Sequence, residues 1–99
     1  MQLDIRHDED SNRFYADLGE PGQRAVLSYR PAGDGVLDFH STLVPPQQRG
    51  NGIGRRIVLH ALRWARDNDF KVVPSCPFVD GVIQDNPDYQ DVVAGATAP

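Results

Sequence analysis

One short stretch of the chain combines residue types that could do chemistry, Arg49-Gly50-Asn51-Gly52-Ile53-Gly54-Arg55-Arg56. An apolar run that ends at Val44 precedes it, and a segment with helical periodicity follows it. A glycine loop between a strand and a helix presents free backbone N–H groups and the positive end of the helix to an anion. The flanking arginines add charge and can bind phosphate oxygens through two N–H groups at once. The stretch therefore predicts a site for a ligand that carries several phosphates.

Two common phosphate-binding loops do not fit this stretch. A P-loop requires Lys followed by Ser or Thr after its last glycine, where this chain has Arg55-Arg56. A dinucleotide loop requires G-x-G-x-x-G inside a βαβ unit, but Arg55 lies three residues after Gly52 and the upstream chain predicts consecutive strands. The pattern that remains is R-x-x-G-x-G, formed by Arg49, Gly52 and Gly54. A plain structural turn before a helix is the alternative interpretation of these glycines.

The pattern R-x-x-G-x-G resembles the acetyl-coenzyme A loop of the GNAT acetyltransferase superfamily. The resemblance extends over roughly residues 3–93 and looks like that of the small, minimal GNAT-like acetyltransferases. Its motifs keep one familiar order along the chain: His40-Ser41-Thr42-Leu43-Val44-Pro45-Pro46, the glycine loop, Lys71-Val72-Val73-Pro74-Ser75-Cys76-Pro77-Phe78-Val79, and Asn86-Pro87-Asp88-Tyr89.

This resemblance implies a GNAT fold, in which the fourth and fifth strands splay apart and acetyl-CoA lies between them as cosubstrate. The pantetheine arm would pair with backbone at the end of the fourth strand, and the pyrophosphate would lie on N–H groups of the glycine loop. The residues predicted to bind the cofactor are Leu43, Val44, Arg49, Gly50, Asn51, Gly52, Ile53, Gly54 and Arg55.

Two departures from the larger GNAT enzymes affect the prediction. Many of those enzymes place a tyrosine on the last helix to protonate the departing thiolate, but here that position is Ile83, and Tyr89 lies beyond Pro87. The general acid therefore has no assignment. The pair of helices that larger members insert between their first two strands is also missing, which predicts an open, shallow acceptor side and favours a bulky or protein amine.

His40 and Cys76 are the candidate catalytic residues, one near the end of the fourth strand and the other at the end of the fifth. If these strands flank the cofactor, both side chains can approach the thioester, and the imidazole of His40 can accept a proton from an attacking amine. A histidine hydrogen-bonded within the sheet is the structural alternative. Cys76 can line the acetyl pocket, act as a nucleophile, or serve only as a small apolar residue. We rank pocket lining before nucleophile.

Composition and charge narrow the functional classes. The 99 residues predict one domain, with a core over about residues 3–93 and a flexible tail over 94–99. No membrane-length apolar run and no secretory signal is visible, and a single cysteine suits a reducing cytoplasm. The histidines and the cysteine lack metal-ligand spacing. The net charge is −4, yet five arginines and no acid lie between residues 49 and 66, which fits a local anionic ligand better than nucleic acid.

The elements that must position these residues predict an α+β (α/β layered) fold. Alternating apolar residues predict strands over residues 2–7, 13–18, 23–30 and 36–44, joined by short turns into an antiparallel meander. An apolar stripe predicts a helix over residues 53–68 that packs on the sheet. A fifth strand over 70–76 and a short helix from Pro77 to Ile83 or Asp85 follow, and residues 89–93 are expected to pack back.

The sequence therefore predicts an enzyme, an N-acetyltransferase that moves an acetyl group from acetyl-CoA to an amine by direct attack. Its acceptor is a small molecule or a protein lysine, and neither nucleic acid nor membrane is an expected partner. A non-catalytic acyl-CoA-binding module would need the same glycine loop, so the loop cannot separate these two functions. A small nucleic-acid-binding module would use the arginines without needing the glycines.

Overall fold

A computed structural model describes residues 3–19 and 21–95, and within them five strands form one mixed sheet. Strands β1 to β4 pair antiparallel in chain order, and β5 lies parallel to β4 at the edge, so the predicted α+β fold is confirmed. Residue 2 of the predicted first strand and residues 96–99 of the predicted tail lie outside the described residues. The strands are β1 (Arg6–Asp8), β2 (Arg13–Asp17), β3 (Arg24–Pro31), β4 (Val36–Leu43) and β5 (Lys71–Val73).

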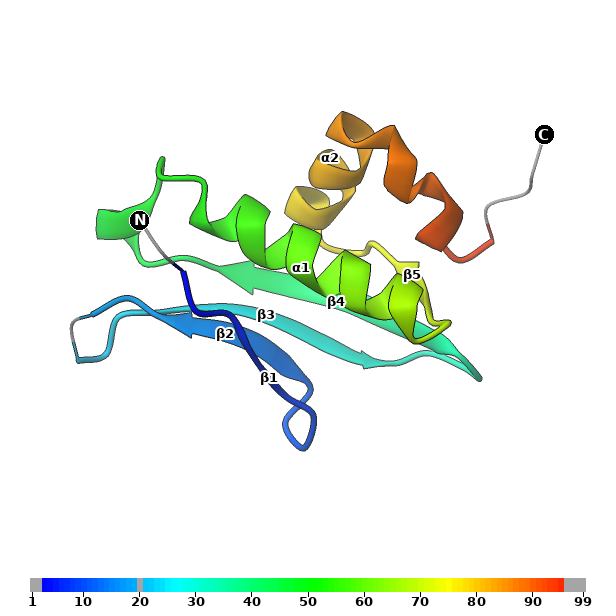
Figure 1. Cartoon of the computed structure of the whole chain (residues 1–99), viewed down its shortest axis with the longest axis horizontal. Helices are drawn as coiled ribbons and strands as arrows, with labels where there is room; N and C mark the ends of the chain where they lie inside the picture. Colours follow the sequence, from blue (N-terminus) through cyan, green and yellow to red (C-terminus); the bar gives the residue numbers. More distant parts are fainter. Residues whose placement is uncertain (1–2, 20, 96–99) are drawn as a thin grey trace.

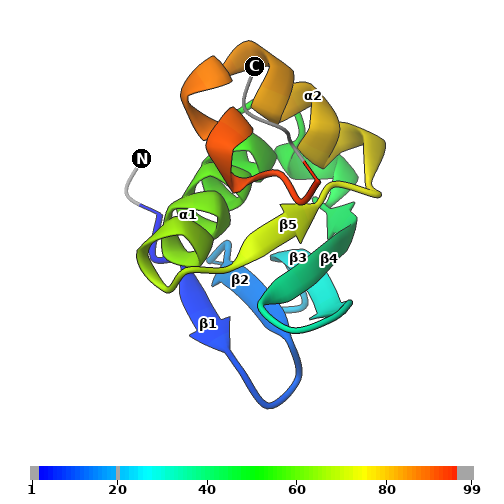
Figure 2. The ribbon, with the colours of Figure 1, turned by 90° about the vertical axis from the view of Figure 1, so that its right-hand side faces the viewer.

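Two α-helices cover one face of this sheet, as Figure 1 shows. They are α1 (Ile53–Asp67) and α2 (Pro77–Asp85), and two 3-10 helices, η1 (Pro46–Gln48) and η2 (Pro87–Val92), flank them. Figure 2 shows α1 running along the sheet beside β5, with α2 and η2 beyond it. Among the described residues, no helix lies against the opposite face of the sheet.

The core lies between the sheet and α1, where both predicted apolar patterns meet. Every second residue of β2 and β3 is buried, and the predicted helix stripe is buried except for Trp64, which is half-buried against Phe70. Side-chain alternation with period 2 and helical periodicity near 3.6 thus bring their apolar faces together. The largest buried side chains include Phe14, Leu27, Phe39, Ile57, Val58 and Leu62.

Several element boundaries differ from the prediction. The first strand begins at Arg6 rather than at residue 2, although Leu3 and Ile5 still pack on the core. The fifth strand ends at Val73 rather than at residue 76, because Pro74 has no N–H group to continue the ladder. Residues 89–93 do pack back, and Val93 forms a parallel bridge with Val72.

A β-bulge in β4 changes which side chains face the helices. Ser28 pairs with Ser41 and Tyr29 pairs with Phe39, so His40 is an additional residue on β4. Phe39 faces the core before the bulge, whereas Leu43, four residues on and in the same phase of simple alternation, is 64% exposed. The bulge therefore shifts the alternation by one residue and turns Thr42 and Val44 toward the helices.

Candidate functional site

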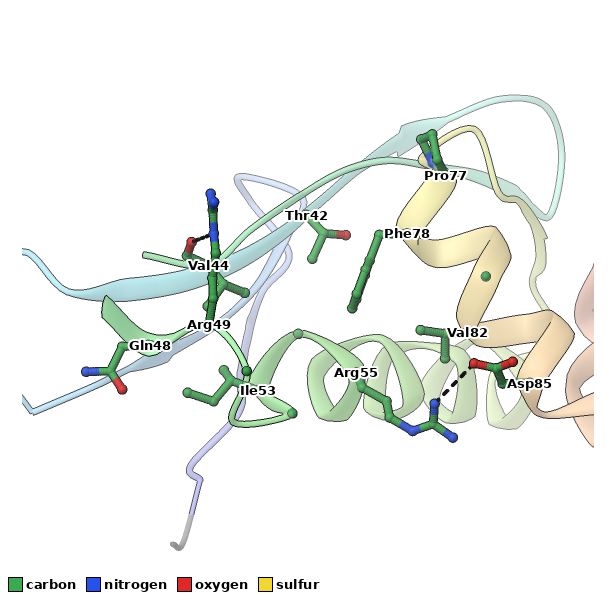
Figure 3. Close-up of a pocket in the computed structure, with 14 residues that line it drawn as sticks. Thr42, Val44, Gln48, Arg49, Ile53, Arg55, Pro77, Phe78, Val82 and Asp85 are labelled. Carbon is green, nitrogen blue, oxygen red and sulfur yellow. Dashed lines mark hydrogen bonds and ion pairs between the residues drawn. The ribbon is translucent and has the colours of Figure 1, made fainter. Parts of the chain in front are cut away.

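A cleft of about 770 Å³ lies between the end of β4, the glycine loop and α2 (Figure 3). This volume lies in the usual range for small-molecule and cofactor sites. The lining residues come from three segments: the end of β4 and the loop after it, the first turn of α1, and one face of α2. They are Thr42, Val44, Gln48, Arg49, Gly50, Gly52, Ile53, Gly54, Arg55, Pro77, Phe78, Gly81, Val82 and Asp85.

The cleft opens because β4 and β5 stay paired over only a short length. Their parallel register runs from Val36 and Lys71 to Asp38 and Val73, and the Cys76 N–H group then donates to the Phe39 carbonyl at 3.0 Å. After Cys76, α2 begins and carries the chain away from β4. The remainder of β4 pairs with β3 on its other side, so its outer edge faces the cleft without a strand partner among the described residues. This separation is the splay that the sequence predicted.

The glycine loop leads into α1, and Gly50, Gly52, Ile53 and Gly54 line the cleft. Gly50 and Gly52 have φ of 88° and 75°, a left-handed conformation in which other residues are strained. The first intrahelical bond runs from the Arg56 N–H group to the Gly52 carbonyl at 3.1 Å, which leaves the preceding N–H groups of the first turn without intrahelical acceptors. No side chain caps this end and no acid lies in its first turn, so the helix end attracts anions.

Gly54 is needed for a different reason, the close approach of α2 and β4 to the first turn of α1. A Cβ atom at Gly54 would lie 3.1 Å from the Phe78 ring and 3.3 Å from Cγ2 of Val44. The ring of Phe78, which is 47% exposed, therefore packs against bare backbone at the helix start. Figure 3 shows this ring standing inside the cleft, between Thr42 and α1.

Two arginines of the glycine-loop segment hold defined positions at the cleft. The Arg49 Nε–H group donates to the Val44 carbonyl at 3.2 Å, which fixes the chain as it leaves β4. Arg55 Nη1 lies 3.5 Å from Asp85 Oδ2, and this ion pair joins α1 to the last turn of α2 across the cleft (Figure 3). Both cationic side chains therefore lie where a phosphate-bearing ligand would reach them.

Cys76 lies just before α2. It is not one of the residues that line the cleft, but it contacts Thr42, which does. Its thiol is nearly buried and donates to the Thr42 hydroxyl at 3.7 Å. Burial raises the pKa of this thiol, but the N–H group of Val79, the Thr42 hydroxyl, and the N–H groups of Phe78 and Thr42 lower it more, and the net pKa lies below its ordinary value. The sequence interpretation found no group to activate this thiol besides His40, and it missed these donors.

His40 lies on the bulge of β4 with an exposed side chain, and it is not one of the residues that line the cleft. The side chain that contacts Cys76 comes from Thr42, two residues further along the strand. Neither His40 nor Cys76 lines the cleft, so the expectation that both side chains approach the thioester stays a prediction. A role for His40 with an acceptor that enters from the open side stays a prediction.

Seven of the nine residues predicted to bind the cofactor line the cleft; the exceptions are Leu43 and Asn51, whose side chains are exposed. Sequence reasoning missed the wall formed by α2. Phe78, Gly81, Val82 and Asp85 follow helical spacing, so the predicted short helix contained the signal for one shared face. Thr42 lines the cleft because of the bulge in β4, and no residue pattern in the sequence predicts that bulge.

No tyrosine among the described residues lines the cleft, so the general acid still has no assignment. Ile83 is buried in the core, and Tyr89 lies in η2 with the Arg66 guanidinium 4.4 Å from its ring centroid; neither lines the cleft. Within the same described residues, no three His, Cys, Asp or Glu side chains gather as a metal site. The described helices include none that is long and apolar enough to cross a membrane.

Comparisons with known proteins agree with this geometry. The chain is similar to Protein NATD1 of Mus musculus, with 30% identity over 83 residues that cover 84% of this chain and 76% of that protein. Protein NATD1 of Gallus gallus is 29% identical over 85 residues, which cover 86% of this chain and 77% of that protein.

A solved structure and a family model extend these matches. The solution structure of a "GCN5-like putative N-acetyltransferase" from Staphylococcus aureus superposes with a TM-score of 0.73 at 28% identity, and the match covers 96% of this chain and 91% of that chain. A model of the GCN5-related N-acetyl-transferase family matches residues 13–92. The chain therefore belongs to the GCN5-related N-acetyl-transferase family.

Proposed function

We propose that this protein transfers an acetyl group from acetyl-CoA to an amine acceptor. Its family supports acyl transfer in general terms, and one observation supports the cofactor. The cleft joins an unpaired strand edge, suited to a peptide-like arm, to a glycine loop with free N–H groups, suited to phosphates. A ligand with both parts, such as acetyl-CoA, uses the whole length of this cleft.

In the proposed complex, the pantetheine arm pairs with the backbone of β4 near Leu43 and Val44. A backbone contact does not require the Leu43 side chain to face the cleft. The pyrophosphate lies on the N–H groups of residues 50–54, with Arg49 and Arg55 adding charge. This arrangement directs the acetyl thioester toward Thr42, which lines the cleft and contacts the Cys76 thiol behind it.

The proposed reaction is direct attack by the amine nitrogen on the thioester carbonyl carbon. A C–N bond forms, the C–S bond breaks, and the thiolate of CoA leaves and takes up a proton. A backbone N–H group holds the negative charge on the carbonyl oxygen of the tetrahedral intermediate. His40 accepts the proton of the attacking amine, directly or through water, and Cys76 contacts the acetyl group.

The acceptor is proposed to be an amine on a bulky molecule, such as a lysine of a protein. A four-residue turn at residues 9–12 joins β1 to β2, so no inserted helices enclose an acceptor pocket there. The sheet face opposite α1 is also uncovered among the described elements. An open acceptor side can admit a large surface, whereas a small amine usually requires an enclosing pocket.

Binding and turnover test the proposal separately. CoA at a hundredfold over its dissociation constant should add about 2.7 kcal/mol of stability, because it binds only the folded chain. For a domain of this size that corresponds to a rise in Tm of roughly 10–20 °C. A melting curve unchanged by millimolar CoA would exclude the proposed cofactor.

Release of free thiol from acetyl-CoA, screened over amines, peptides and basic proteins, tests the chemistry. Acceptor-dependent release supports the transferase. Tight CoA binding without release for any acceptor would instead favour a non-catalytic acyl-CoA-binding module. Salt-steep binding to DNA or RNA without CoA binding would favour a nucleic-acid-binding module.

A further inference from the structure

We infer that Asp85 sets the affinity of the cleft for its phosphate-bearing ligand, by competing for Arg55 and by repelling the phosphates. The inference rests on the proposed function, because it names how that same site controls its ligand. Among the residues that the structure describes, Asp85 is the one carboxylate that lines the cleft. Its carboxylate lies beside Arg55, the arginine of the first turn of α1 that an anion in the cleft would use.

The carboxylate of Asp85 already holds the Arg55 guanidinium in an ion pair. Their charged atoms are 3.5 Å apart, and the side chains are 46% and 69% exposed. A phosphate that binds at the start of α1 must draw Arg55 away from this carboxylate or share it. Part of the binding free energy is then spent on separating the pair, and affinity falls accordingly.

Helix stability does not explain why an acid stands at this position. Asp85 is the last residue of α2, where the negative end of the helix dipole disfavours a carboxylate, and no basic residue lies in that turn. Exposed ion pairs contribute little to folding, with typical values of about 0–1 kcal/mol. The pair is therefore better explained by its effect on the cleft than by its effect on the fold.

Asp80 provides a matched control on the same helix. It lies in the first turn of α2, where the helix dipole favours an acid, and its Oδ2 accepts a hydrogen bond from Gln84 Nε2 at 2.8 Å. Asp80 does not line the cleft. Asp85→Asn and Asp80→Asn thus remove the same charge from the same helix, one facing the proposed ligand and one not.

Weaker binding of CoA can help a transferase to release its product. Acetyl-CoA and the product CoA carry the same phosphates, so a carboxylate that repels phosphate weakens both to the same extent. Asp85 therefore shortens the residence of CoA after transfer and limits inhibition by the product. Asp85→Asn should tighten both ligands by the same factor and slow the dissociation of CoA.

Isothermal titration of CoA into the wild type and both variants tests the inference. At about 50 mM KCl, Asp85→Asn should bind CoA about three- to tenfold tighter, since removing one charge several ångströms from a polyanion changes its energy by that order. Asp80→Asn should bind like the wild type. At about 500 mM KCl the gain should shrink toward unity, because screening weakens interactions between exposed charges.

The Arg55→Ala background separates competition from repulsion. There the gain from Asp85→Asn should be smaller, because no cation remains for Asp85 to occupy. Unchanged or weaker CoA binding by Asp85→Asn, the same gain in both backgrounds, or a gain that does not respond to salt would overturn the inference while leaving the proposed cofactor intact. Absence of CoA binding in the wild type would overturn the proposed function and this inference with it.

Discussion

Cys76 and Thr42 meet where β4 and β5 separate, which is where the proposed thioester lies. The Cys76 thiol precedes a helix and contacts a hydroxyl and several N–H groups that lower its pKa. These groups stabilise a thiolate, and they can equally orient a neutral acetyl group. Direct transfer and a covalent acetyl-cysteine therefore both fit this contact geometry, and kinetics must decide between them.

Separate substitutions of His40 and Cys76 should distinguish the proposed proton acceptor from the residue that contacts the acetyl group. His40→Ala should lower turnover about 10²–10⁴-fold, the usual contribution of general-base assistance, while CoA affinity stays nearly unchanged. The exposed position of His40 means that this variant should fold normally. Cys76→Ser and Cys76→Ala should both keep substantial activity, because direct attack needs no covalent step. Steady-state kinetics with two varied substrates should show no ping-pong pattern.

Intact mass measured after mixing with acetyl-CoA provides the opposing outcome. An acetyl group trapped on Cys76, together with an inactive Cys76→Ala variant, would make Cys76 the nucleophile. Normal turnover in His40→Ala would show that binding and orientation carry the reaction without this histidine.

At the scale of elements, the glycine loop and α1 were predictable because local chemistry determines them. Left-handed backbone at Gly50 and Gly52, a proline-bounded strand end and an apolar helical stripe are all visible in the residue order. The bulge at His40 was not predictable, because it depends on how β4 registers against β3. That register determines which residues of β4 face the cleft. The sequence therefore predicted the position of the glycine loop but not the contribution of Thr42.

The loop predicts a clear difference between a variant within it and a variant on the outer face of α1. Gly52→Val should abolish CoA binding, because a branched side chain is strained at φ of 75° and would block the approach of a phosphate to the backbone. Arg63→Ala should barely change binding, because Arg63 is exposed on the outer face of α1 and does not line the cleft. Thermal shift with CoA measures both. Equal losses would indicate diffuse electrostatic attraction in place of a backbone cradle.

At the scale of the whole molecule, the described residues form one core and leave one face of the sheet without a helix. Both α-helices lie on one side of the sheet, and the short edge strand β1, which pairs with β2, contacts α1 through an aromatic cluster. The His7 ring stacks on Phe14 with centroids 3.9 Å apart, meets Trp64 edge-on at 4.5 Å, and shares a hydrogen bond of 2.6 Å with the Tyr29 hydroxyl. The sequence did not reveal this cluster, because its members lie far apart along the chain.

The aromatic cluster predicts that acid destabilises the fold through two histidines. Burial lowers the pKa of His7 despite the nearby acids Glu9 and Asp8. The second histidine, His60, is more exposed and meets the Phe14 ring edge-on with centroids 5.9 Å apart; partial burial and then the charge of Arg63 lower its pKa. Unfolded histidines therefore bind protons at a higher pH than folded ones. Stability from this source should be complete above about pH 6.5 and decline as the pH falls through the lowered values.

Denaturant unfolding at about pH 7.5, 6.5 and 5.5 measures this decline, in a range above the ordinary pKa values of carboxylates. His60→Gln lacks one titrating group, so its unfolding free energy should fall less steeply over this range than that of the wild type. His40→Ala is the matched control, because His40 lies on β4 outside the aromatic cluster. A wild-type stability that stays constant from pH 7.5 to 5.5, or equal slopes for His60→Gln and His40→Ala, would show that the cluster accommodates protonated histidine without cost.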